Sequence, residues 1–114
     1  TGAPMREFLF VDDLAEAVIF SINNLLPDSI YNIGTGKDIS IKSLSEIIKD
    51  ITAFKGEIIW DTSKPDGTPR KLLNVNKIKE IGWQFNTELF DGIHKTYDWF
   101  LKNTQNLKLK NYKV

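Results

Sequence analysis

The loop over residues 61–71 holds the side chains of this sequence that are best suited to binding a ligand. It concentrates three cations, two acids, two prolines and one glycine between two apolar segments. Proline fixes φ near about −65° and glycine takes conformations that other residues avoid, so the loop could hold Asp66, Arg70 and Lys71 in place before a ligand arrives. Such preorganisation suits an anionic ligand. The alternative is a solvated connector between a strand and a helix, because loops are usually polar.

Arg6 is a second candidate for anion binding. It leads an apolar segment shortly after a Gly-Ala-Pro sequence, which would place its guanidinium at the edge of a sheet, where clefts form. A bidentate contact to a phosphate or carboxylate there would contribute roughly 1.5–3 kcal/mol. The alternative is an ion pair with Glu7 or Asp13, and exposed pairs of that kind contribute roughly 0–1 kcal/mol.

The glycine-containing segment 34–39 (Gly-Thr-Gly-Lys-Asp-Ile) lies between a possible strand and a possible helix, as a phosphate-binding turn would. A dinucleotide-binding fingerprint requires a third glycine where Ile39 stands, and Lys37 followed by Asp38 does not make a nucleoside-triphosphate loop. The sequence therefore favours a tight turn that leads into a helix.

The remaining polar candidates have simpler structural interpretations. The pair Asp12 and Asp13 could be catalytic, but its place at a helix start favours capping of free backbone N–H groups. His94 is the only histidine and there is no cysteine, so a typical zinc site is excluded and we expect a structural role. Trp60 adjoins the charged loop, where it could belong to the core or line a ligand pocket.

The pattern of apolar residues predicts a single α/β unit in which strands and helices alternate. Strands are expected over residues 6–11, 30–33 and 57–60. Four helices are expected: one begins at Asp13 and ends before Pro27, one covers 41–51 with Ser40 as its cap, one covers 75–81 between Asn74 as cap and Gly82 as terminator, and one begins at Thr87. The prediction is a small mixed sheet of three strands with four helices.

Length and composition limit the kind of protein. The 114 residues suffice for one compact domain, and the 15 cations balance the 15 acids, so no overall positive charge recruits nucleic acid or an acidic membrane. No apolar run reaches the roughly 18 residues that span a bilayer, which together with the absence of cysteine indicates a soluble, cytoplasmic protein. Because the sequence opens on Thr1, we expect it to be a piece of a longer protein. Residues 1–103 would form the domain, and 104–114 a flexible tail rich in lysine and asparagine.

Three motifs resemble the C-terminal third of the GDP-L-fucose synthases. They are Pro-Met-Arg-Glu-Phe-Leu-Phe-Val-Asp-Asp-Leu-Ala (4–15), Tyr-Asn-Ile-Gly-Thr-Gly (31–36) and Ser-Lys-Pro-Asp-Gly-Thr-Pro-Arg-Lys-Leu-Leu (63–73). The first two are typical of extended short-chain dehydrogenases that act on nucleotide sugars, and the third is more specific. The resemblance implies an enzyme that converts GDP-4-keto-6-deoxy-D-mannose to GDP-L-fucose by epimerisation at C3 and C5 and reduction by NADPH. It also implies that this chain is the substrate-binding region, while NADP(H) binds to an N-terminal Rossmann domain outside it.

The resemblance assigns substrate-binding positions to Arg6 and Asp66, and places Arg70 and Lys71 close to the diphosphate or guanosine of a GDP-sugar. It places the catalytic residues upstream of this chain, so we expect no catalytic, cofactor-binding or metal-binding residue here and no activity from the chain alone. Phe10 stands where related sequences often carry histidine, so a polar role at that position is in doubt.

Two expectations concern partners. The first predicted helix and the 30–33 strand would pack against the missing Rossmann domain, so the chain by itself should self-associate through that face, and we expect the parent enzyme to be a homodimer. Nucleic acid and membrane are not expected as partners.

Two other functions stay open. The parent could be a different nucleotide-sugar epimerase or reductase. Alternatively, the chain could be a non-catalytic module whose basic loop and Trp60 bind an acidic protein surface or a single-stranded nucleic acid.

Overall fold

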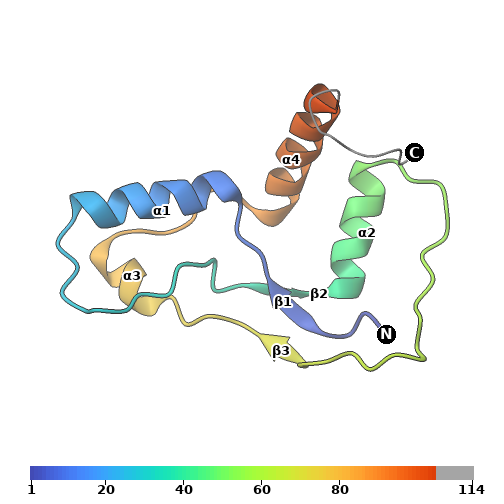
Figure 1. The fold of residues 1–114 in the computed structure, drawn as a ribbon, viewed down its shortest axis with the longest axis horizontal. Helices are drawn as coiled ribbons and strands as arrows, with labels where there is room; N and C mark the ends of the chain where they lie inside the picture. Colours follow the sequence, from blue (N-terminus) through green and yellow to red (C-terminus); the bar gives the residue numbers. More distant parts are fainter. Residues whose placement is uncertain (105–114) are drawn as a thin grey trace.

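The computed structural model describes residues 1–104, and the predicted tail beyond them lies outside the described residues. The described residues form seven helices and strands. The molecule is elongated (Figure 1), and its dimensions are 49 × 36 × 23 Å. In chain order these elements are β1 (Met5–Glu7), α1 (Val11–Asn23), β2 (Asp38–Ser40), α2 (Ile41–Ile51), β3 (Arg70–Lys71), α3 (Asn76–Ile81) and α4 (Leu89–Asn103). The predicted α/β unit of three strands and four helices is therefore confirmed for the described residues.

The sheet has β1 at its centre, in the order β2-β1-β3. β2 runs antiparallel to β1, with Met5 opposite Ser40 and Glu7 opposite Asp38. β3 runs parallel to β1, with Met5 opposite Arg70. A parallel pair requires a long connection. Here an extended arm, residues 52–69, follows α2 around one end of the molecule before the chain returns as β3 (Figure 1).

Two of the three predicted strands were placed wrongly. Residues 30–33 and 57–60 form no strand among the described residues, and the second and third strands are instead β2 and β3. Ile30 is 75% exposed, and the segment that it begins pairs with no other strand within residues 1–104. A strand needs a hydrogen-bonding neighbour as well as an apolar sequence, and these segments lack one here.

The segment that contains Trp60 is fixed by packing rather than by strand pairing. A Cβ on Gly2 would lie 2.7 Å from Cη2 of Trp60, so the indole ring rests directly on the backbone at Gly2. Because Gly2 has a φ of +77°, glycine is favoured there for its conformation as well as for its size. This contact holds the middle of the extended arm against the start of the chain.

The predicted boundaries of α2 and α3 agree well with the structure. Ser40 is the N-cap of α2, and its Oγ accepts a hydrogen bond of 3.0 Å from the N–H of Ser43. Gly82 ends α3 in the left-handed conformation, with a φ of +110°. The N-cap position of α3 is Val75 rather than Asn74, but the Asn74 side chain accepts a hydrogen bond of 3.0 Å from the first N–H of the helix. α4 begins two residues later than the predicted Thr87.

The prediction that Asp13 caps the first helix was wrong. α1 begins at Val11 with Phe10 as its N-cap, and no side chain caps it. Asp13 is only 2% exposed, and it accepts hydrogen bonds from the backbone N–H groups of Asn86 (3.3 Å) and Thr87 (2.9 Å). The carboxylate therefore connects α1 to the segment that leads into α4.

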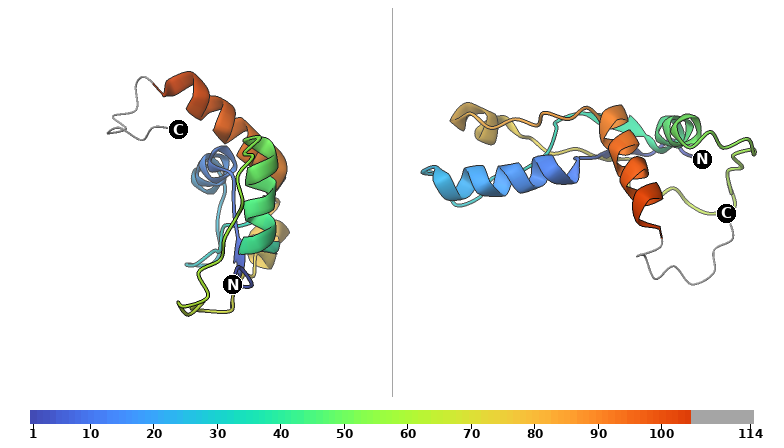
Figure 2. Two further views of the ribbon diagram at one scale, coloured as in Figure 1. Left: turned by 90° about the vertical axis from the view of Figure 1, so that its right-hand side faces the viewer. Right: turned by 90° about the horizontal axis from the view of Figure 1, so that it is seen from above.

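The hydrophobic core is small and lies between α1 and the region around α3. Its buried members are Ala17, Val75, Ile78 and Trp83, and five partly buried side chains pack against them: Leu9, Phe20, Tyr31, Ile33 and Phe85. Figure 2 shows how thin the molecule is when it is turned by 90° in either direction. Few side chains can be fully enclosed in so thin a body.

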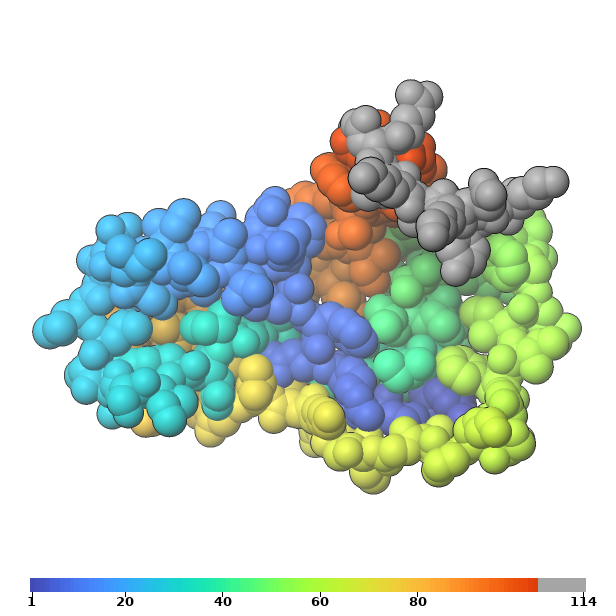
Figure 3. All heavy atoms as spheres, viewed as in Figure 1, coloured from blue at the N-terminus to red at the C-terminus, as the bar shows by residue number. Residues whose placement is uncertain are grey.

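One face of α1 carries exposed apolar side chains. Ile22 is 76% exposed, and further large apolar residues of this helix are also exposed: Val11, Leu14, Val18 and Ile19. Figure 3 shows α1 as a continuous outer surface of the molecule. This face of α1 is therefore an uncovered apolar surface within residues 1–104.

None of the helices in the described part of the chain is long and apolar enough to cross a membrane.

Candidate functional site: a cationic groove beside β1 and β3

A groove of about 570 Å³ runs beside β1 and β3 and contains three of the four predicted binding residues. Its lining residues are Arg6, Glu7, Leu9, Ile33, Gly34, Arg70, Lys71, Leu72 and Leu73. The parallel pairing of β1 with β3 places Arg6 opposite Lys71, although 65 residues separate them along the chain. The sheet therefore brings two basic segments, predicted separately, into one site.

The guanidinium of Arg6 is held by backbone carbonyl groups. Its Nη1 donates to the carbonyl oxygen of Met5 at 2.7 Å, and its Nη2 donates to that of Thr68 at 2.8 Å. The two carboxylates that sequence reasoning considered as partners bind elsewhere, and Arg6 forms no ion pair among the residues described. Because a guanidinium has five N–H donors, this leaves a half-buried, oriented cation with further donors for a ligand.

Arg70 and Lys71 differ in their partners. The guanidinium of Arg70 makes two hydrogen bonds to Asp38, from Nε at 2.5 Å and from Nη2 at 3.2 Å. These bonds raise the pKa of Arg70, and they compensate its charge. Lys71 is exposed and forms no ion pair within residues 1–104. The uncompensated cations of the groove are therefore Arg6 and Lys71.

Asp66 does not line the groove. Its Oδ1 accepts a hydrogen bond of 2.7 Å from the amino group of Thr1, and its Oδ2 accepts one from the Thr1 hydroxyl. The two bonds lower the pKa of Asp66. The structure thus separates Asp66 from the other three predicted residues.

Glu7 is the residue of the groove that sequence reasoning missed. Its Oε1 accepts hydrogen bonds from the backbone N–H groups of Thr35 (2.5 Å) and Gly36 (2.7 Å), and from the Thr35 hydroxyl (3.3 Å). Its Oε2 accepts a bond of 2.8 Å from the N–H of Leu73. One carboxylate thereby joins three segments of the chain. The signal in the sequence was an acid beside Arg6 with a glycine-containing turn further along, but the pairing is a long-range contact.

The turn at residues 34–36 therefore binds an anion that belongs to the protein itself. Gly36 has a φ of +70°, and two successive N–H groups converge on one oxygen of Glu7. Such an arrangement of backbone donors can bind phosphate, but here the carboxylate occupies it. This agrees with the expectation of a tight turn rather than a phosphate loop, although the turn leads into β2 before the chain enters α2.

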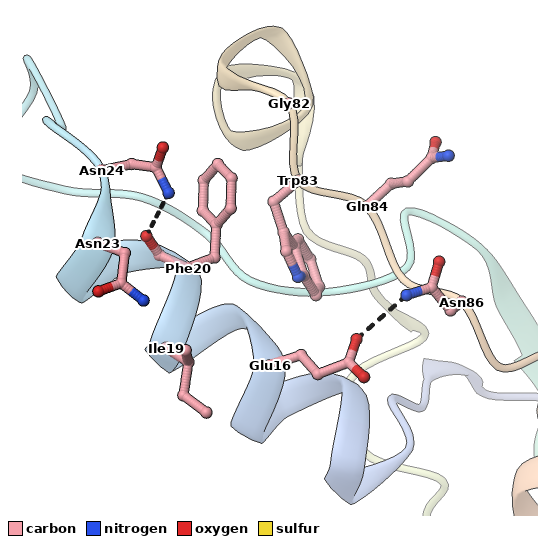
Figure 4. A pocket seen from close by; sticks show the side chains of 9 residues that line it. All are labelled: Glu16, Ile19, Phe20, Asn23, Asn24, Gly82, Trp83, Gln84 and Asn86. Carbon is pink, nitrogen blue, oxygen red and sulfur yellow. Dashed lines mark hydrogen bonds between the residues drawn. The ribbon is translucent and has the colours of Figure 1, made fainter.

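A second hollow of about 510 Å³ lies between α1 and the segment that follows α3. Figure 4 shows its amides around the rings of Phe20 and Trp83, and the hydrogen bond of 3.1 Å between Asn86 and Glu16. The residues that line it include one carboxylate and no cation. It is therefore poorly suited to an anionic ligand, and none of the predicted site residues lies in it.

The other candidates from the sequence lie outside the groove. Trp60 lines a separate surface pocket with Lys42 and Lys49. Nδ1 of His94 lies 3.4 Å from Oδ2 of Asp98, one turn along α4. No group of three or more His, Cys, Asp or Glu side chains among residues 1–104 is arranged to hold a metal ion.

Comparison with known proteins identifies the relatives of the chain. No protein-family model matches it. A probable GDP-L-fucose synthase from Oryza sativa subsp. japonica is 46% identical over 108 residues, which cover 95% of this chain and 33% of the rice protein. The chain is homologous to the GDP-L-fucose synthases. It spans about one third of the length of the curated relatives that it matches.

Solved structures agree with this homology. A GDP-L-fucose synthetase from Naegleria fowleri, bound to NADP, matches with a TM-score of 0.85 and 29% identity over 92% of this chain and 34% of that one. A GDP-6-OMe-4-keto-L-xylo-heptose reductase from Campylobacter jejuni matches with a TM-score of 0.83 and 39% identity over 90% of this chain and 32% of that one. The small sheet and its helices thus correspond to part of nucleotide-sugar epimerase and reductase structures.

Proposed function

We propose that this chain is the substrate-binding part of an enzyme that converts GDP-4-keto-6-deoxy-D-mannose to GDP-L-fucose, and that its groove binds the diphosphate of the GDP-sugar. The observation that carries the proposal is the parallel pairing that sets Arg6 opposite Lys71 at one groove. A diphosphate carries its charge on several oxygens, and two uncompensated cations side by side match it. The groove volume of about 570 Å³ is in the usual range for ligand sites.

The other two predicted binding residues take secondary roles in this proposal. Arg70 is held against Asp38 and lines the groove, so it contributes a fixed wall and spare N–H donors toward the nucleotide. Asp66 is held at the extended arm and would contact the nucleotide or sugar beyond the groove. Both roles rest on the family resemblance as well as on these contacts, because the groove by itself does not show what Arg70 or Asp66 would bind.

In the proposal, proton transfer and hydride transfer belong to other parts of the protein. No Tyr-x-x-x-Lys sequence occurs here, since Tyr31 is followed four residues later by Thr35 and Tyr97 by Leu101. The described residues also do not fit NADP(H), because the N–H groups of the glycine turn are committed to Glu7. We therefore assign the cofactor and the reacting groups to the two thirds of the relatives' length that this chain does not match, and expect the chain alone to be inactive.

The exposed face of α1 supports a further part of the proposal. Large apolar side chains along this helix have no cover within residues 1–104. We assign to this face the remainder of the enzyme, with its Rossmann domain, as the covering partner, in a homodimeric parent.

GDP binding to the complete protein tests the function. Replacement Arg6→Ala or Lys71→Ala should weaken GDP affinity about ten- to hundredfold, measured by isothermal titration calorimetry, because each removes a charged contact to the diphosphate. Lys77→Ala is the matched control, since Lys77 is paired with Asp28 and does not line the groove. Unchanged affinity in both groove variants would contradict the proposal.

A related nucleotide-sugar epimerase or reductase is the second candidate function. It is favoured by the match to the heptose reductase and by a groove whose cations recognise phosphate rather than a base. A comparison of GDP with UDP in the same titration separates GDP-sugar enzymes from UDP-sugar enzymes, and turnover of the sugar substrate separates the two candidates where both act on GDP-sugars. The first requires clear preference for GDP, and turnover of GDP-4-keto-6-deoxy-D-mannose by the complete protein.

A further inference from the structure

We propose that Glu7 is a positioning residue for the groove: its carboxylate fills the glycine turn as an internal anion, ties that turn to Leu73, and so leaves Arg6 and Lys71 as the cations that receive a ligand's diphosphate. This inference rests on the proposed function for the identity of the ligand. The role of Glu7 in the turn rests on its own contacts.

The turn at residues 34–36 is built for an anion. Two successive N–H groups and one hydroxyl, from Thr35 and Gly36, point at a single carboxylate oxygen of Glu7. The positive φ of Gly36 allows this convergence. With Glu7 in place these donors are satisfied, and a ligand's phosphate would meet a negative charge there.

The same carboxylate sets the spacing of the groove walls. Gly34 and Leu73 both line the groove, and both lie against Glu7. A Cβ on Gly34 would collide with Oε1 of Glu7 and would lie 3.3 Å from Cδ1 of Leu73. The two walls can therefore approach each other only because residue 34 has no side chain. Both walls contact the carboxylate of Glu7.

Glu7 also lies next to the two cations that would bind the ligand. Glu7 follows Arg6 directly in β1, and Leu73 follows Lys71 by two residues. The hydrogen bond that the N–H of Leu73 donates to the Glu7 side chain thus ties the two segments together beyond the end of β3. Loss of this bond would release the chain beside Lys71 and change the geometry in which both cations meet one diphosphate.

Asp13 offers a matched control for this role. Its carboxylate also accepts two backbone N–H bonds and a threonine hydroxyl bond, and it is buried, but it does not line the groove. If Glu7 served stability alone, its loss and the loss of Asp13 would have the same kind of effect.

The experiment compares Glu7→Ala, Glu7→Gln and Asp13→Ala with the unaltered complete protein. GDP affinity is measured by calorimetry and the thermal unfolding midpoint by calorimetric scan, each with sodium formate or with sodium chloride at equal ionic strength. Formate is a free carboxylate that can enter a turn vacated by Glu7.

Glu7→Ala should lower GDP affinity about tenfold or more, and formate should raise both its affinity and its unfolding midpoint more than chloride does. Glu7→Gln fills the turn but sets an amide donor against an N–H, so it should weaken GDP binding without a response to formate. Asp13→Ala should lower the midpoint, change GDP affinity less than about twofold, and show no specific response to formate.

The proposal is overturned if Glu7→Ala loses no more GDP affinity than Asp13→Ala, or if formate acts equally on all variants. If Glu7→Ala does not fold, Glu7→Gln decides, because full GDP affinity in that variant contradicts the positioning role. If Arg6→Ala and Lys71→Ala leave GDP binding unchanged, the proposed function fails instead, and the formate response of the Glu7→Ala midpoint still tests the role of Glu7 in the turn.

Discussion

Thr87 donates two hydrogen bonds to the carboxylate of Asp13, one from its backbone N–H and one from its hydroxyl at 3.1 Å. The two residues lie on segments that are far apart in the sequence, and the contact is almost completely buried at Asp13. It connects the first helix to the entry of the last one, so the arrangement of α1 and α4 depends on it.

Replacement Asp13→Ala should lower the free energy of unfolding by about 2–3 kcal/mol, because it leaves buried backbone donors without an acceptor. Asp12→Ala is the matched control. Asp12 is exposed on the same turn of α1, and its loss should cost less than about 1 kcal/mol. Denaturant unfolding of both variants measures the difference, and equal losses would show that the buried hydrogen bonds of Asp13 add no stability.

Asp61 should contribute to the dependence of stability on pH. Hydrogen bonds from the hydroxyl and N–H of Ser63 lower the pKa of Asp61 below its ordinary value of 3.8. A folded-state pKa below the unfolded one means that the contribution is present above the unfolded value and is lost as the pH falls through the folded one. The stability difference between the unaltered protein and Asp61→Asn should therefore shrink as the pH falls below about 4.

The measurement is a carboxyl NMR titration of Asp61 together with denaturant unfolding across this range. Ser63→Ala should move the pKa of Asp61 back toward 3.8, since it removes the hydroxyl bond that lowers it most. A pKa for Asp61 at or above 3.8 in the unaltered protein would contradict the assigned cause.

The 114-residue chain by itself should self-associate through the outer face of α1. Ile22→Lys places a charge at the C-terminal end of this apolar surface, on its most exposed side chain in α1, and should shift the chain toward the monomer, because burying the charge in an interface is unfavourable. Ile59→Lys is the control, since Ile59 is 83% exposed but lies on the extended arm. Sedimentation velocity over a range of concentrations measures the result, and a monomer at high concentration in the unaltered chain would contradict the prediction.

Local signals in the sequence were sufficient to locate all four helices, and they gave the ends of α2 and α3 well. Ser40 was identified as a cap and Gly82 as a terminator because each acts on backbone groups within a few residues of itself. The same local reasoning assigned Asp13 to a cap. Its true partners are more than seventy residues away, and no local pattern marks them.

The strands and the groove show where sequence reasoning ends. β3 consists of Arg70 and Lys71, which carry no alternation of apolar and polar residues, and its pairing comes from β1 rather than from its own composition. Ile30 begins an apolar segment that reads as a strand but has no neighbour here. The basic residues of the site were identified by type, while their proximity to one another, and to Glu7, required the sheet.

The contacts of Glu7 also set an order in time for the assembly of the groove. The hydrogen bonds to Thr35 and Leu73 span 28 and 66 residues of the chain. Contacts that close such long loops form late, after local helices such as α1 and α2 have had time to form. During synthesis, residue 73 must leave the ribosome before Leu73 can bind Glu7, so the groove is completed well after the strand that carries Arg6 has emerged.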